Sequence, residues 1–281
     1  MRPLLITGFL LSCLGLVAPA SAATPQRPIT NPKFDPNAPQ IGMFEAIAED
    51  AIEAKLIPKS SLEGTLLLTN KGKEPLTVHV PEGFVGVPVS AQFGGAGGGL
   101  GGGGLGGGGL GGQQGGGQQQ AVGGGLGGGG LGGGGLGGGG GFGGGGGGFF
   151  SIPAERTVAL KMTSVCLEHG KSEPNSRVEY KVISVEEYTQ DPILRKLIVM
   201  VGTGRLETGA AQAAAWNVAS GMDWNALANK QYNRVAAADV PYFSRQQLVQ
   251  AQAVVAAAEY AAKTETEQPA AETPRTSRTG R

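Results

Sequence analysis

Apolar and polar residues alternate in several short stretches of the chain before residue 187, and this two-residue period is typical of half-buried β-strands. Strands are expected at 55–58, 64–70, 75–81, 84–91, 156–167 and 178–186. One face of the strand at 156–167 carries Val158, Leu160, Met162 and Ser164. Cys166 continues the same phase, so its side chain is expected to point into the core.

Breaker and turn residues suggest how three of these strands are arranged. Pro58 closes the stretch 55–58, which is typical of an edge strand. Residues 71–74 join 64–70 to 75–81 and predict either a hairpin or a strand-to-strand turn. Alternation within the second of these strands places His79 on the solvent side.

Helical spacing of the apolar residues appears first at 43–54 and dominates from residue 192 onward. Helices are expected at 43–54, 192–201, 209–220, 224–230 and from Ser244 to about Ala262. Gly221 stops the third helix, Asp223 caps the fourth, and Ser244 with Gln247 forms a capping box for the last. The last helix has an apolar stripe that can dock on the β-structure: Leu248, Ala251, Val255, Ala258 and Ala262.

These elements predict an α+β protein. A small antiparallel, Ig-like β-sandwich is expected at 41–190, with a helical section at 191–262 packed on it. Residues 23–40 are proline-rich and predict an extended linker, and the polar residues 263–281 predict a disordered tail.

Residues 94–148 hold most of the chain's 53 glycines and no charged residue. Six leucines recur there in two runs of five-residue period: Leu100, Leu105, Leu110, Leu126, Leu131 and Leu136. Five fits neither a helix nor a strand, and so few apolar residues cannot offset the entropy that glycine loses on ordering. The block therefore predicts a disordered, solvated insertion between two strands. A second interpretation stays open, in which its Leu and Phe residues drive self-association. Deleting 94–148 would then leave the fold intact and abolish assembly.

The N-terminus predicts export. Arg2 precedes an apolar run at 4–18, and Ala20-Ser21-Ala22 is a cleavage pattern, so residues 1–22 are expected to be a signal peptide cut after Ala22. Lipidation at Cys13 is not expected, because cleavage before it would leave a very short signal. No later segment is long enough to span a membrane. The mature protein is expected to be secreted or periplasmic.

The charge balance limits the expected binding partners, and the cysteine content limits the possible disulfides. Lys and Arg total 22 and Asp and Glu total 22, which gives no electrostatic case for nucleic acid or anionic lipid. Protein or an envelope polymer is the expected partner. Loss of the signal peptide leaves Cys166 as the one mature cysteine, so an internal disulfide is excluded.

No complete catalytic or metal motif appears. A Cys166–His169 nucleophilic dyad lacks an identifiable orienting residue, and residues three apart on a strand point to opposite faces. Cys166, His169 and His79 do not have a recognisable zinc spacing. We therefore expect no enzyme activity, no cofactor and no metal.

One local motif resembles the thioester domains of bacterial surface adhesins. Val165-Cys166-Leu167 is similar to their cysteine motif, and Gln212, Ala214, Ala215 and Trp216 match their glutamine stretch, whereas Ala211 stands where they usually have threonine. The resemblance covers about ten residues. It implies a thioester between Cys166 and Gln212 that captures amines, with Trp216 and His169 in support. A buried free thiol and an alanine-rich helix anchored by Trp216 is the alternative.

The layout as a whole resembles a family of uncharacterised secreted planctomycete proteins. The residues that carry this resemblance are Ile57-Pro58-Lys59, Thr69-Asn70-Lys71, Val85-Gly86-Val87-Pro88, the glycine-rich insert ending in Phe149-Phe150, 165–171 with Pro174-Asn175, and 210–216 before Asp223-Trp224. It covers most of 41–235 and implies export and a shared fold, without an activity. The sequence thus favours an exported, non-enzymatic structural or interaction protein, with a thioester adhesin as the rival.

Overall fold

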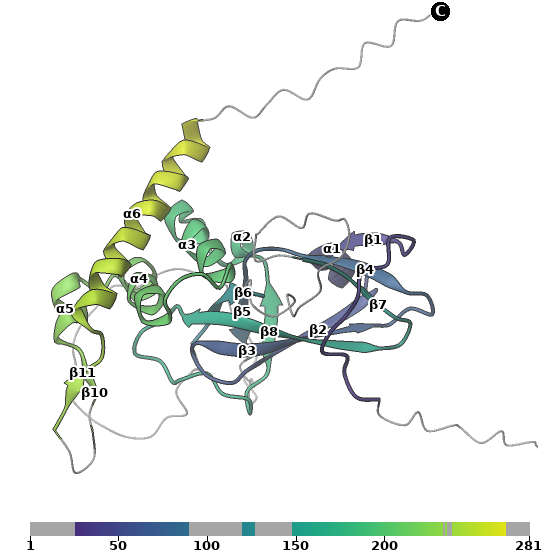
Figure 1. Cartoon of the computed structure of the whole chain (residues 1–281), viewed down its shortest axis with the longest axis horizontal. Helices are drawn as coiled ribbons and strands as arrows, with labels where there is room; N and C mark the ends of the chain where they lie inside the picture. Colours follow the sequence, from purple (N-terminus) through teal and green to yellow (C-terminus); the bar gives the residue numbers. More distant parts are fainter. Residues whose placement is uncertain (1–25, 90–119, 127–147, 233, 235–237, 268–281) are drawn as a thin grey trace, which may run out of the picture.

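The computed structural model describes residues 26–89, 120–126, 148–232, 234 and 238–267. The predicted signal peptide, most of the glycine-rich block and the tail beyond Glu267 lie outside these residues. Within them the protein is a mixed α+β structure, as the sequence predicts, with helices α3 to α6 gathered at one end of an elongated β-structure (Figure 1). No helix in this described part is long and apolar enough to cross a membrane.

Six antiparallel strands close into a barrel, in the order β2-β3-β8-β6-β5-β9. Their bounds are β2 Ile52–Pro58, β3 Glu63–Asn70, β8 Thr157–Cys166, β6 Val122–Gly125, β5 Phe84–Pro88 and β9 Tyr180–Ile183. Strands β1 (Gln40–Gly42), β4 (Leu76–Val80) and β7 (Gly148–Ile152) form a second sheet, with β4 in the middle. The predicted Ig-like sandwich is therefore replaced by a closed barrel beside a small sheet.

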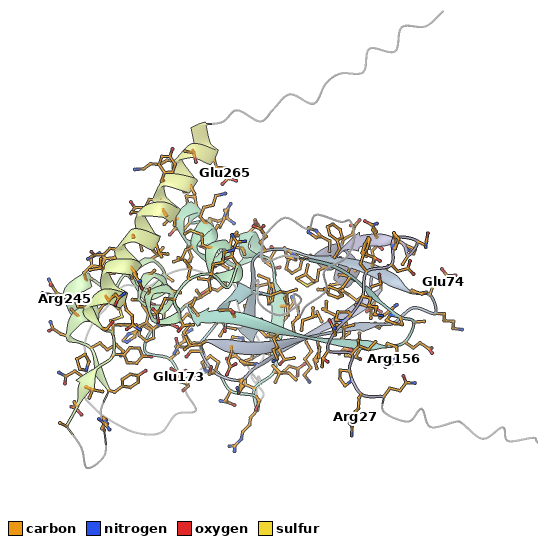
Figure 2. All side chains as sticks on the ribbon, in the orientation of Figure 1. Arg27, Glu74, Arg156, Glu173, Arg245 and Glu265 are labelled. Atoms are coloured by element: carbon orange, nitrogen blue, oxygen red, sulfur yellow. The ribbon has the colours of Figure 1, made fainter. Side chains whose placement is uncertain are left out.

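The remaining elements are mostly helical. Their bounds are α1 Met43–Ala48, α2 Val185–Tyr188, α3 Pro192–Gly202, α4 Thr208–Ser220, α5 Trp224–Asn229 and α6 Arg245–Glu267, with the two short strands β10 Gln231–Tyr232 and β11 Val240–Pro241 forming a hairpin before α6. Figure 2 shows Arg245 and Glu265 at the two ends of α6, and Glu74 and Arg156 at the end of the β-structure away from the helices.

Several strand predictions change in the structure. The sequence pattern gives the strands at 64–70 and 75–81 correctly, but β3 and β4 lie in different sheets, so they are not a hairpin. Strand β2 pairs with both β3 and β9 and is not an edge strand. His79 is exposed, as predicted. The strand predicted at 178–186 ends at Ile183, because Ser184 accepts a hydrogen bond from the Glu187 N–H and begins α2.

Two helix predictions also change. The helix predicted at 43–54 ends at Ala48, and after a turn at Asp50 (φ 57°) the chain joins β2, because Ile52 pairs with Asn70. The apolar stripe of α6 packs on α3 and α4 rather than on the β-structure. The helix caps are confirmed: Asp223 accepts from the Ala226 N–H, and Ser244 and Gln247 exchange two hydrogen bonds.

The glycine-rich block is not one continuous loop. Residues 122–125 form β6, which lies between β8 and β5 with all four residues buried, and Gly148 begins β7. The prediction of a wholly disordered insertion is wrong at these residues.

Two apolar cores lie on opposite faces of the barrel wall. The first, which we call the barrel core, holds Val122, Leu160, Cys166 and Tyr180 together with other side chains of the barrel strands and of α1, β4 and β7. The outer core, between the wall and the helices, holds residues of the other phase, such as Val165 and Leu167, with α3, α4 and α6. The end of β8 therefore contributes to both cores.

Candidate functional site

Residues 165–171 form the junction of the molecule. This segment ends β8 and contacts three separate parts of the chain: β6 from the glycine-rich block, helix α4, and Lys230 after α5. Both candidate reactive residues, Cys166 and Gln212, lie at this junction.

The Gln212 side chain binds the main chain of Cys166. The Cys166 N–H donates to Gln212 Oε1 (2.9 Å), and Gln212 Nε2 donates to the Cys166 carbonyl oxygen (2.9 Å). Gln212 lies on α4 and is 2% exposed. Strand β3 begins at Glu63, opposite Thr163, so it offers no partner to Cys166. The carboxamide takes the place of the missing strand and satisfies two buried backbone groups.

A second contact joins α4 to the same segment. Ser220 Oγ donates to the Leu167 carbonyl (3.0 Å) and accepts from the His169 N–H (2.9 Å). Gln212, in the second turn of α4, and Ser220, its last residue, together hold the helix against the end of β8. The structure therefore brings together the sequence-predicted residues Cys166, Gln212 and His169.

The Cys166 thiol lies on the other side of the wall from α4. Cys166 is fully buried in the barrel core, as the strand phase predicts, and is a free cysteine. Burial raises the pKa of this thiol, and the charge of Glu173 raises it further. A buried, protonated thiol is a weak nucleophile.

Strand β6 occupies a narrow channel, which we call the glycine slot. It is lined by β5, by β8 and by Glu82, Ile198 and Gly202. A Cβ on Gly124 would overlap the Thr163 carbonyl oxygen and lie 2.8 Å from Ser164 Cα, and one on Gly125 would overlap the Glu82 carbonyl oxygen. Only glycine fits at these two positions, because the atoms opposite are backbone.

Polar contacts fix the segment that enters the slot. The Ala121 N–H donates to Glu168 Oε2 (2.9 Å), Tyr180 Oη donates to the Gln120 carbonyl (3.0 Å), and Gln120 Nε2 donates to the Lys171 carbonyl (3.0 Å). Val122 and Leu126 place their side chains in the barrel core. The position of β6 is therefore specified by its flanking residues.

An aromatic cluster lies beside His169 and encloses a lysine. Trp216 contacts the rings of His169, Tyr242 and Phe243, with 4.7–5.8 Å between centroids. Tyr242 in turn contacts Phe243 (4.8 Å) and stacks on Tyr232 (4.2 Å). Lys230 Nζ lies 5.3 Å from the Trp216 ring and 5.1 Å from the Tyr242 ring, within the range of cation–π attraction. The ammonium also lies 3.0 Å from His169 Nε2.

His169 is expected to stay neutral to lower pH than an ordinary histidine. Partial burial lowers its pKa, and the positive charge of Lys230 lowers it further. Lys230→Met should therefore raise the pKa toward about 6.5, and an NMR titration of the imidazole protons would measure the change. Lys263→Met, on the exposed side of α6, is the matched control.

This depression of the pKa couples to stability. The unfolded chain takes up a proton on His169 near pH 6.5, whereas the folded chain takes it up only at lower pH, so His169 lowers stability as the pH falls through that interval. Above the unfolded pKa the effect is absent. A wild-type titration at or above about pH 6.5 would contradict this arrangement.

The cluster of three or more His, Cys, Asp or Glu side chains that a metal ion needs is absent from the described residues. His79 stacks on Phe149 (4.4 Å between ring centroids), on the small sheet formed by β1, β4 and β7. The structure thus separates His79 from Cys166 and His169. No protein-family model, curated protein or solved structure matches the chain. The resemblances to the planctomycete family and to thioester domains remain predictions.

Sequence reasoning missed Lys230, Tyr242, Glu168 and the whole of β6. A signal for β6 exists: the five-residue leucine period breaks between Leu110 and Leu126, where residues 118–122 read Gln-Gln-Gln-Ala-Val. Lys230 has no comparable signal, because its aromatic neighbours come from separate elements.

Proposed function

We propose that the protein is an exported, non-enzymatic structural or interaction protein of the cell envelope or extracellular space. In this proposal the barrel is a folded body that carries glycine-rich segments as its contact elements. One observation supports it above others: the glycine-rich block contributes β6 to the barrel wall. The block is thereby attached to the body after β5, at β6 and before β7.

The composition of the attached segments suits weak, repeated contacts. Each holds leucines at a five-residue period, which are too sparse for a core of their own. Several weak contacts on one chain raise the overall affinity for a polymer or for other copies without new contacts at any single site. The expected partners are protein, an envelope polymer or a second copy of this chain.

Replacing the repeat leucines should release the protein from the envelope. We expect a variant with serine at Leu100, Leu105, Leu110, Leu131 and Leu136 to move from the envelope fraction of the native host to the soluble exported fraction. Leu126 is kept because it belongs to the barrel core, so the fold should persist. Fractionation followed by immunoblotting measures the distribution.

The matched control replaces two exposed apolar residues outside the block. Val249 and Tyr260 are 61% and 71% exposed on α6, and serine at both should leave the fractionation unchanged. If the leucine variant fractionates like the wild type, the glycine-rich segments are not the contact elements.

A thioester adhesin is the second candidate function, because Gln212 and Cys166 lie in contact although 46 residues separate them. The Cys166 thiolate would attack Gln212 Cδ and ammonia would leave, which forms an acyl thioester. An amine on a partner would then attack the same carbon, form an amide and release the Cys166 thiolate. In the present arrangement the carboxamide binds the main chain of Cys166, and burial disfavours the thiolate. These two facts favour the structural proposal.

Intact mass spectrometry of the protein from its natural host separates the two candidates. We expect the mass of residues 23–281, with a thiol that resists alkylation in the native protein and reacts once the chain is unfolded. A mass lower by one ammonia, with no thiol even after unfolding, would establish the thioester instead.

A further inference from the structure

Strand β6 is connected to the rest of the chain differently from the other five strands of the barrel. Each of the others has a short connection to another described element, for example residues 59–62 between β2 and β3 or 153–156 between β7 and β8. Strand β6 is reached through residues 90–119 and left through 127–147. It can therefore leave and enter a barrel without moving any other strand.

We propose that β6 is exchanged between copies of this chain, so that residues 120–126 of one molecule fill the glycine slot of a second. This inference names the partner for the function proposed above and rests on it. The exchanged segment makes the same hydrogen bonds and buries the same side chains as in its own barrel. Exchange therefore changes the connection between molecules and not the structure of the barrel.

The lengths of the two connections permit this exchange. In general, a flexible glycine-rich linker of 30 residues has a root-mean-square end-to-end distance of about 30 Å, and one of 21 residues about 25 Å. Both spans are similar to the width of a small domain, so a slot in an adjacent copy is within reach. Connections of this length give an intramolecular effective concentration of about millimolar, so crowded copies compete with a molecule's own strand.

The slot selects residues 120–126 over the leucine repeats. Val122 and Leu126 are four residues apart and both lie in the barrel core, whereas the repeat leucines are five apart. If a leucine repeat occupied the slot with its first leucine at the Val122 position, its second leucine would fall one residue beyond the Leu126 position and would point to the opposite face of the barrel wall. Residues 96–100 have the four-residue spacing, but they carry Ala96 at the Val122 position and are preceded by two glycines instead of Gln120 and Ala121.

An empty slot would leave two unpaired strand edges. Strand β6 pairs with Phe84, Val85 and Gly86 of β5 and with residues 163–166 of β8, so its loss opens a closed barrel. Unpaired edges readily accept an added strand. A vacated slot therefore favours recapture of β6 from any copy nearby.

A disulfide placed across the slot tests the exchange. Val122 lies directly opposite Cys166 on the adjacent strand, and both are buried in the barrel core. In a full chain carrying Val122→Cys and Cys13→Ser, mild oxidation with copper phenanthroline joins position 122 to Cys166 in whichever barrel holds the strand. A strand in its own barrel gives an intrachain bond, and an exchanged strand gives a covalent dimer or chain of copies.

Isotope-labelled and unlabelled copies are mixed before oxidation and analysed by non-reducing electrophoresis and peptide mass mapping. We expect interchain bonds between the two labels, with a fraction that rises about fiftyfold as the protein goes from about 10 µM to about 1 mM. Intrachain bonds alone at every concentration would overturn the exchange. The leucine variant described above, with the same cysteine pair, should still exchange, because its slot and residues 120–126 are intact.

A peptide experiment on the wild-type chain decides the matter if the cysteine variant does not fold. A peptide of residues 118–127 carries Cys at the Val122 position as a pyridyl disulfide, so attack by Cys166 forms a mixed disulfide and releases the thiopyridone. We expect an adduct at Cys166 in the folded protein, and none with a control peptide that also carries Val at the Gly124 position. No adduct from either peptide overturns the proposal. If exchange is absent while the wild type still fractionates with the envelope, the proposed function stands without it.

Discussion

Gly124→Ala is expected to prevent the barrel from closing. The added Cβ would overlap the Thr163 carbonyl oxygen and lie 2.8 Å from Ser164 Cα, and neither atom can move without breaking the pairing of β6 with β8. We expect a loss of more than about 4 kcal/mol in the free energy of unfolding, which is large for a single methyl group. Urea titration followed by far-ultraviolet circular dichroism would measure it.

Gly42→Ala is the matched control, because a Cβ there meets nothing closer than 3.8 Å and its φ is −68°. That change should stay within about 1 kcal/mol of the wild type. A Gly124→Ala protein with wild-type unfolding would contradict the account of the glycine slot. The same account reverses an expectation drawn from the sequence: deleting residues 94–148 removes β6 and should unfold the barrel rather than leave it intact.

Gln212→Ala is expected to have the second largest effect. The change leaves the N–H and the carbonyl of Cys166 without partners in a position that water does not reach. An unpaired buried polar group costs about 1–3 kcal/mol, so the two together should lower the free energy of unfolding by about 3–5 kcal/mol. Urea unfolding monitored by tryptophan fluorescence is a suitable measurement, because Trp216 lies on the same helix.

Gln190→Ala provides the control for this substitution. Gln190 is exposed and bonds the Glu186 carbonyl and the Arg195 side chain, so its loss should cost less than about 1 kcal/mol. Equal effects of the two substitutions would show that the Gln212 carboxamide does not replace a strand. Cys166→Ala retains both hydrogen bonds of the main chain and should cost less than Gln212→Ala.

The helical section follows from the sequence more closely than the barrel does. Helix ends depend on nearby residues, so the sequence predicts them directly. Examples are the cap at Asp223, the end of a helix at Gly221 and the capping box of Ser244 and Gln247. The alternation of apolar and polar residues in β8 likewise predicts which side chains point inward, and it places Cys166 correctly. These features are decided within a few residues of the chain.

Which strand pairs with which cannot be predicted from nearby residues in this way. Strand β3 pairs with β8, about ninety residues later, and not with its neighbour β4, because the choice depends on how whole faces pack. Strand β6 has three glycines and no side-chain pattern to recognise, and the shape of its neighbours makes it a strand. The thioester resemblance pairs Gln212 with Cys166, but it does not predict that the Gln212 carboxamide binds the Cys166 main chain. That contact depends on where β3 begins, because β3 starts too late to pair with Cys166.

The strand order of the barrel has a consequence for how the chain acquires its fold as it is synthesised. Strands β2, β3 and β5 precede the glycine-rich block, but their partners β8 and β9 follow it, so the first part of the chain cannot complete a sheet alone. Contacts between residues so distant in sequence form slowly. A chain of this design should remain open until Ile183 has emerged, which is compatible with the export proposed above, and should gain its protease resistance late and in a single step.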